Sequence, residues 1–237
     1  MAIDWVEVPS GVVLRGTPTD EIERLVDQHR QYDLPRSYFA KEAPRTEVHV
    51  PSFAIARTLV TVEQWNQFCD VIGWIPAAAD GRLPVEGTAW WQAQAFCEWT
   101  AAASGLSIRL PSEDEWERAA RGDDTREYPW GDTFETRRAN LAELGIGHSL
   151  PVGSLPLGAS PFGLLDMAGN ADEWTATEYS PYPGAPDDVP QVEPQSFDRH
   201  ITRGGGYGHC KDLARCARRH GIYERGGGAG FRVAMTA

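Results

Sequence analysis

Glycine and proline interrupt almost every segment of this chain from Pro129 onward. The apolar runs in this part are short, as in Phe231–Met235. Because glycine and proline favour turns and end regular elements, we expect long irregular loops here. Such loops need buried aromatic side chains, internal ion pairs or bound cations to fix them. The nine tryptophans of the chain can supply the first of these.

Helix signals are confined to the first half of the chain. Two capping boxes, opened by Thr61 and Ser112, each precede apolar residues at three-to-four spacing. In such a box a hydroxyl and a Gln or Glu side chain satisfy backbone amides at a helix start, so each predicts a helix. The expected helices are one of about three turns after Thr61, one over 89–103, one from Ser112 to Gly122, and a weaker one over 20–29.

The size and composition predict one domain. A chain of 237 residues with 41% hydrophobic and 24% charged residues can bury a core, and two independent cores are not expected. We therefore predict a single domain over 1–237, in which the proline-rich stretch 179–194 is a solvent-exposed insertion, with disorder as the alternative. No apolar run reaches the roughly 20 residues of a membrane helix, and no leader pattern opens the chain, so we expect a soluble, cytoplasmic protein.

The net charge of −12 disfavours nucleic acid and anionic membranes as partners, because their phosphates would be repelled. The charge is unevenly distributed. Between Arg199 and Arg232 there are eight basic residues and two acidic ones. Two interpretations stay open: a basic tail paired with an acidic body, or a surface that binds an anion or a peptide.

Four cysteines are too few to staple a domain of this size with disulfides. Cys69 and Cys97 lie on apolar faces with helical spacing and are expected to be inert buried thiols. Cys210 and Cys216 lie among glycines and arginines, where positive charge would favour the thiolate. They are the candidate reactive pair.

Four segments in order carry a resemblance to a known family. They are Val60–Trp65; Arg109–Glu117 with Ala119–Gly122 and Tyr128–Gly131; Phe162–Asn170 with Glu173–Thr175; and Arg203–Tyr207 with Gly230–Ala234. The chain resembles the formylglycine-generating enzymes, also called sulfatase-modifying factors. The resemblance implies an α+β fold of the C-type lectin class, with a small twisted antiparallel sheet, few helices and extensive ordered loops.

The resemblance also implies structural calcium, a hard cation that suits oxygen ligands from loops. The implied sites are one of Asp166, the carbonyls of Gly169 and Ala171, and Glu173, and one of Asn140 and the Leu141 carbonyl. An alternative role for Asp166 and Glu173 is loop capping, or a salt bridge to an arginine near the C-terminus.

The best-known members of the family oxidise a peptide cysteine with oxygen at two cysteines that bind Cu(I), a soft ion that favours thiolates. In this chain five residues separate Cys210 from Cys216, where the family has four, and Gly206 stands in place of a serine. Asp172 also replaces a tryptophan that is common in the family. The active centre is therefore altered.

Three interpretations of the altered centre stay open. Cys210 and Cys216 would hold copper on a reshaped loop, or His209, Cys210 and Asp172 would hold another metal such as non-haem iron. Alternatively, His209 makes a loop hydrogen bond and Cys210 is a packed thiol.

We expect from these observations an oxygen-dependent, metal-assisted oxidoreductase that acts on a thiol or peptide substrate. Cys210 and Cys216 would be its catalytic residues, as metal or redox ligands. An anionic or peptide substrate would be bound by Arg203, Arg215, Arg218 and Arg219. The alternative is a non-catalytic module that binds a ligand or protein on the same lectin-like scaffold. The sequence sets neither the substrate nor the oligomeric state.

Overall fold

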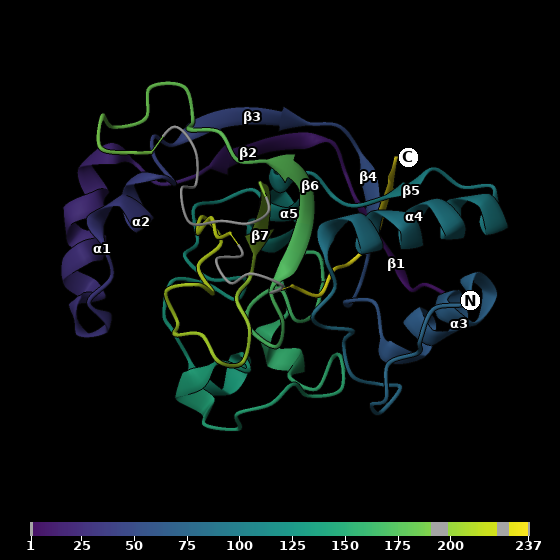
Figure 1. Ribbon diagram of the computed structural model, residues 1–237. Helices are drawn as coiled ribbons and strands as arrows, with labels where there is room; N and C mark the ends of the chain where they lie inside the picture. Colours follow the sequence, from purple (N-terminus) through teal and green to yellow (C-terminus); the bar gives the residue numbers. More distant parts are fainter. Residues whose placement is uncertain (1, 191–198, 222–227, 237) are drawn as a thin grey trace.

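The computed structural model of the chain describes residues 2–190, 199–221 and 228–236 (Figure 1). Its helices are α1 (Ile22–Gln28), α2 (Arg36–Ala40), α3 (Val62–Ile72), α4 (Trp90–Ser104) and α5 (Glu113–Arg121), with 3-10 turns at Thr19–Glu21, Arg30–Tyr32, Thr136–Arg138, Ala142–Leu144 and Pro156–Gly158. Its strands are β1 (Trp5–Val8), β2 (Gly11–Arg15), β3 (Thr46–Val50), β4 (Phe53–Ala56), β5 (Ile108–Arg109), β6 (Glu173–Glu178), β7 (His200–Arg203) and β8 (Ala234–Thr236).

The capping boxes start helices as predicted. At α3 the Gln64 amide donates to Thr61 Oγ1 at 3.3 Å, and the Thr61 amide donates to Gln64 Oε1 at 2.9 Å. Ser112 and Glu115 form the same reciprocal pair at α5. Because both partners satisfy amides that the first helical turn leaves unpaired, these starts are set locally.

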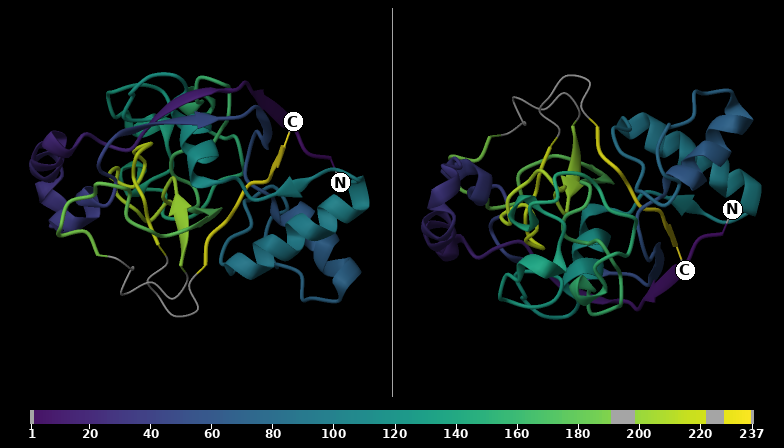
Figure 2. Two further views of the ribbon diagram at one scale, coloured as in Figure 1. Left: turned by 90° about the horizontal axis from the view of Figure 1, so that it is seen from above. Right: turned by 90° about the horizontal axis from the view of Figure 1, so that it is seen from below.

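The strands form one four-stranded antiparallel sheet in the order β1-β4-β8-β5, with two separate antiparallel pairs, β2-β3 and β6-β7. The first and last strands of the chain thus both lie beside β4. The helices α1 and α2 lie at the opposite end of the molecule from α3 and α4 (Figure 2). The few helices and small antiparallel sheets confirm the expected α+β class.

Aromatic side chains fill the core. Trp65, Phe68 and Phe96 pack with Phe231 between α3, α4 and the last segment of the chain. Trp116 of α5 packs in a second cluster against the strands β1 and β4 and is fully buried. The prediction that tryptophan packing supports a loop-rich chain holds at these positions.

Residues 179–190, the described part of the expected insertion, are exposed only in part, at Ser180, Pro183, Gly184, Asp187 and Asp188. Tyr182 and Val189 are buried, and Val189 packs against the residues of α1 and α2. Tyr182 and Val189 thus attach the loop to the core, while Pro183 and the two aspartates stay exposed. Residues 191–194 of the expected insertion lie outside the described residues. Among the helices that the structure describes, none has both the length and the apolar character that crossing a membrane requires.

Candidate functional site

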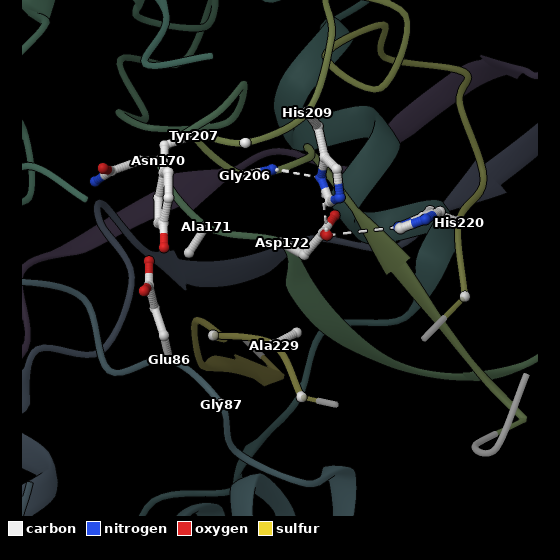
Figure 3. A pocket seen from close by; sticks show the side chains of 14 residues that line it. Glu86, Gly87, Asn170, Ala171, Asp172, Gly206, Tyr207, His209, His220 and Ala229 are labelled. Carbon is white, nitrogen blue, oxygen red and sulfur yellow. Dashed lines mark hydrogen bonds and ion pairs between the residues drawn. The ribbon is translucent and has the colours of Figure 1, made fainter. Parts of the chain in front are cut away.

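A cavity of about 530 Å³ opens where several loops meet at the start of β6 (Figure 3). Its described wall contains five side chains that can ionise: Glu86, Asp172, Tyr207, His209 and His220. Most of the remaining wall is glycine backbone, which lets a ligand approach the main chain closely. The size lies in the range of small-molecule sites.

Long-range hydrogen bonds hold the loops around the cavity. The amides and carbonyls of Thr88 and Ala229 exchange two backbone bonds of 3.1 Å, although 141 residues separate them. The indole of Trp174 donates to the Thr88 carbonyl at 2.8 Å. These bonds hold Thr88, two residues after Glu86, against Ala229 and against Trp174 of β6, and they thereby position Glu86.

The loop that carries Asp172 turns through a left-handed pair, Gly169 (φ 76°) and Asn170 (φ 72°). The Asn170 side chain stabilises this turn because its Oδ1 accepts the Leu150 amide at 2.8 Å and its Nδ2 donates to the Leu150 carbonyl at 3.1 Å. The turn sets Asp172 in the cavity wall and Glu173 at the first position of β6.

Asp172 lies between two imidazoles. Its Oδ2 is 3.2 Å from Nδ1 of His209 and 3.5 Å from Nδ1 of His220. Burial would raise the pKa of Asp172, but the two histidines outweigh it, and the pKa lies below its ordinary value. Burial lowers the pKa of His220 and wins over the attraction of Asp172. The group therefore contains an ionised carboxylate beside a neutral His220.

The tautomer of His209 follows from its contacts. The Gly206 amide donates to Nδ1 at 3.0 Å, which requires a ring nitrogen without hydrogen, so the neutral ring carries its hydrogen on Nε2. In the other tautomer Nδ1 carries the hydrogen, donates to Asp172 Oδ2 at 3.2 Å and leaves Nε2 as the nitrogen that can accept a hydrogen bond. The side chain of His209 is 37% exposed, so a ligand in the cavity can reach its ring.

Glu86 stands on the other side of the cavity, and the Tyr207 hydroxyl points toward its carboxylate (Figure 3). The side chain keeps contact with solvent along the cavity, but the surrounding protein reduces the hydration of its carboxylate. This desolvation, with a smaller contribution from the charge of Asp172, raises the pKa of Glu86 to about 7, while a hydrogen bond with Ser149 opposes the shift. Glu86 can therefore gain or lose a proton near neutral pH.

Neither candidate cysteine lines the cavity. Cys216 is fully buried in the apolar cluster around Trp116, and this burial raises the pKa of its thiol to about 12. Cys210 is partly exposed and its pKa is raised, first by burial. The expectation that positive charge favours a thiolate is wrong for both, because desolvation outweighs the neighbouring arginines. The structure does not gather the two thiols at the cavity.

The four arginines expected to bind substrate are at most 2% exposed. Arg203 pairs with Glu117, and Arg219 binds Glu113 at 2.8 Å. The other pairs are Arg215 with Glu42 at 2.6 Å and with Asp212 at 2.7 Å, and Arg218 with Asp212 at 2.7 Å. A buried guanidinium needs such partners to offset its lost hydration. Arg203, Arg215 and Arg219 thus pair with the acidic body, as one of the two interpretations expected, whereas Arg218 pairs with Asp212 inside the basic segment.

The first calcium site does not fit the residues present. Both oxygens of Glu173 accept from Arg232, at 2.5 and 2.7 Å, and Oε2 also accepts from the Trp116 indole. A guanidinium therefore occupies the position of a cation, as in the salt-bridge alternative. Two further implied ligands are also engaged within the protein: Asp166 Oδ2 accepts the Gly153 amide at 2.7 Å, and the Gly169 carbonyl accepts the Ala171 amide. The remaining implied ligand belongs to Ala171, which lines the cavity.

The second implied calcium site has one unused ligand. Asn140 is 2% exposed and its Oδ1 has no hydrogen-bond partner, whereas the Leu141 carbonyl accepts the Leu144 amide. The mixed transition-metal site fits less well. His209 and Asp172 do come together, but Cys210 lies outside the cavity, and the described part of the chain contains no group of three His, Cys, Asp or Glu side chains that could hold a metal ion.

Three residues of this site were missed in the sequence. Tyr207 follows three glycines in the family motif, and an aromatic residue next to glycines that leave space for a ligand is the signal that could have identified it as a cavity residue. Glu86 and His220 have no local pattern, because they reach the cavity through pairings between distant segments.

Comparisons with known proteins agree with the fold. A hercynine oxygenase of Mycolicibacterium thermoresistibile is 32% identical over an alignment of 223 positions, which covers 73% of this chain and 48% of that protein. The chain thus spans about half the length of this curated relative.

Two solved structures have similar folds. PvdO from Pseudomonas aeruginosa superposes with a TM-score of 0.75 at 25% identity, covering 98% of this chain and 94% of that one. Variable protein 1 of Treponema denticola gives 0.72 at 19% identity, covering 98% and 95%, a likeness of fold alone. Residues 2–237 match the profile of the sulfatase-modifying factor enzyme 1-like domain. The chain belongs to the family of sulfatase-modifying factors, the formylglycine-generating enzymes.

Proposed function

We propose that the chain is an oxidoreductase whose reaction takes place in the cavity of Asp172, His209 and His220, on a small molecule or on a side chain of a peptide. The observation that carries this proposal is the contact of one ionised carboxylate with two imidazoles in the wall of a 530 Å³ cavity. The relationship to an oxygenase supports the class of reaction, and the geometry of the cavity supports its location.

His209 would accept a proton from the substrate. Oxidation of an X–H bond removes a proton as well as electrons, and Asp172 stabilises the imidazolium that results. Molecular oxygen is the proposed electron acceptor. Gly206 would let the substrate lie against the main chain, since a Cβ atom there would meet nothing closer than 3.6 Å.

Cys210 and Cys216 have no role in this proposal, and neither copper nor iron is assigned to residues. Calcium remains proposed only at Asn140 and Leu141, supported by the unpartnered Asn140 Oδ1. A rise in the melting temperature with calcium, absent in Asn140→Ala, would support that site, and no rise would remove it.

Oxygen uptake tests the proposed function. The probes are free cysteine, a cysteine-containing peptide, and hercynine, the compound in the name of the mycobacterial relatives, each with and without added Cu(I) or Fe(II). We expect uptake with at least one probe, lost in Asp172→Asn and His209→Gln and kept in Cys210→Ala. Glu98→Gln, at an exposed position of α4, is the matched control.

The alternative function is a binding module on the same scaffold. The similar fold of a variable protein is compatible with it, but at 19% identity it supports the scaffold only. No uptake with any probe, together with ligand binding in the cavity, would favour this alternative over the oxidoreductase.

A further inference from the structure

The charged side chains of the cavity wall are acidic. Glu86 and Asp172 face the cavity, and none of the described residues that line it is a lysine or an arginine. We propose that the cavity takes a substrate group with a protonated amine nitrogen, which binds between the Glu86 and Asp172 carboxylates. This inference rests on the proposed function and names the substrate class of the same site.

An unsatisfied acceptor supports an N–H donor. Asp172 is 8% exposed, and its Oδ1 has no hydrogen-bond partner among the described residues. A buried carboxylate oxygen without a donor is costly, and the cost falls when a donor reaches it. The histidines contact the other oxygen, Oδ2, and the Gly205 amide also interacts with the carboxylate. Because Oδ1 is buried in the wall, an N–H group of a ligand would reach it through a local shift of the glycine-rich wall.

The charges around Glu86 favour a cation. The ionisable groups that line the cavity with it are Asp172, Tyr207, His209 and His220. Asp172 adds negative charge, and burial keeps His220 neutral by lowering its pKa. A bound ammonium would stabilise the ionised form of Glu86, which desolvation and, to a smaller extent, repulsion from Asp172 now disfavour.

Among the described residues, few groups are placed to bind an anionic substrate. The four arginines near the C-terminal end are buried in pairs with Glu42, Glu113, Glu117 and Asp212. The Gly206 amide, which could bind an anion, already donates to His209. The net charge of −12 also attracts cations toward the surface.

The hydroxyl of Tyr207 adds a further acceptor. It lies in the cavity wall and is directed at Glu86, so an ammonium beside that carboxylate can also donate to the hydroxyl oxygen (Figure 3).

Calorimetric titration with small probes tests the inference without turnover. The probes are n-butylammonium, tetramethylammonium, n-butanol and butyrate, and the Nα-acetyl amide of lysine distinguishes a free amine from a peptide side chain. We expect n-butylammonium or the lysine derivative to bind at least tenfold more tightly than butyrate. Tetramethylammonium, which has the charge but no N–H donor, should bind more weakly than n-butylammonium.

Two variants connect the binding to the carboxylates. Glu86→Gln should weaken n-butylammonium binding by about tenfold at pH 8 and by less at pH 6, where Glu86 of the wild type is largely protonated. Asp172→Asn should weaken it at both pH values, and Glu98→Gln should not change it. Melting temperatures verify that each variant is folded.

Two results would overturn the inference: butyrate binding as tightly as n-butylammonium, or unchanged n-butylammonium binding in both Glu86→Gln and Asp172→Asn. Equal binding of tetramethylammonium would overturn the N–H requirement. The two proposals can fail separately. Oxygen uptake with an uncharged substrate would leave the oxidoreductase standing and remove the amine, whereas amine binding without uptake would do the reverse.

Discussion

Asp172 and Glu173 are consecutive carboxylates with opposite surroundings. Asp172 lines the cavity and contacts His209 at 3.2 Å, whereas Glu173 is fully buried and bound to Arg232 through both oxygens. Successive residues of an extended chain point to opposite sides, so the start of β6 separates the two carboxylates. One serves the cavity and the other joins β6 to the last segment of the chain.

Removing the buried pair should destabilise the fold. Glu173→Gln leaves the Arg232 guanidinium buried without a counter-charge, a change that typically costs about 3–5 kcal/mol. Urea unfolding of the purified variant measures the loss. Asp172→Asn, one residue earlier, should cost less because its side-chain partners are histidines and the change leaves no buried guanidinium without a counter-charge. An equal or larger loss for Asp172→Asn would contradict the assigned roles.

Two neighbouring glycines should respond differently to a side chain. Gly205 has a φ of 71°, and a Cβ there would lie 2.9 Å from the Cβ of Leu213, so Gly205→Ala should cost about 1–3 kcal/mol. At Gly206 a Cβ meets no atom within 3.6 Å, so Gly206→Ser, which restores the residue of the family, should change stability by less than about 0.5 kcal/mol. Denaturation midpoints compare the two variants, and equal losses would contradict this geometry.

Glu86 should make stability depend on pH. Its pKa rises from the ordinary 4.5 to about 7 in the folded protein, so between these values the folded state binds more protons than the unfolded state. Stability should therefore fall as the pH rises from 5 to 7 and level off above, relative to Glu86→Gln. Unfolding measured at pH 5, 6, 7 and 8 in both proteins gives the difference. If the stability of wild type minus that of Glu86→Gln rises with pH instead of falling, the predicted direction of the pKa shift is wrong.

The thiols should react slowly in the folded protein. Burial raises the pKa of Cys97 and of Cys216 to about 12, and Cys69 is fully buried. A thiol reagent at pH 7.5 should modify at most one cysteine, Cys210, and none in Cys210→Ala, whereas all four react after unfolding. Rapid modification of both Cys210 and Cys216 would restore them as a reactive pair.

Local patterns predicted the helices but only part of the site. The starts of α3 and α5 depend on residues three positions apart, and the predicted starts coincide with the observed ones. The helix α2 was missed because its five residues carry no cap and little periodicity. The family motifs gave the fold class, since they cover the buried turns and strands.

The cavity depends on contacts that no local pattern contains. Glu86 is positioned by the pairing of Thr88 with Ala229, and His220 by its bridge to Thr202. The basic segment looked like an anion-binding surface because its partners, such as Glu42 and Glu113, lie more than 100 residues away in the sequence. Cys216 looked reactive because its arginine neighbours are visible in the sequence and its burial is not.

Oxygen uptake by wild type, Asp172→Asn and Cys210→Ala, measured side by side with the most active probe, tests most directly whether the reaction depends on the cavity. We predict that Cys210→Ala stays within about twofold of wild type and that Asp172→Asn loses about a hundredfold or more, the range for a lost proton-transfer group. Loss of uptake in Cys210→Ala with full activity in Asp172→Asn would contradict the account, because it would show that Cys210, and not the cavity carboxylate, is needed for the reaction.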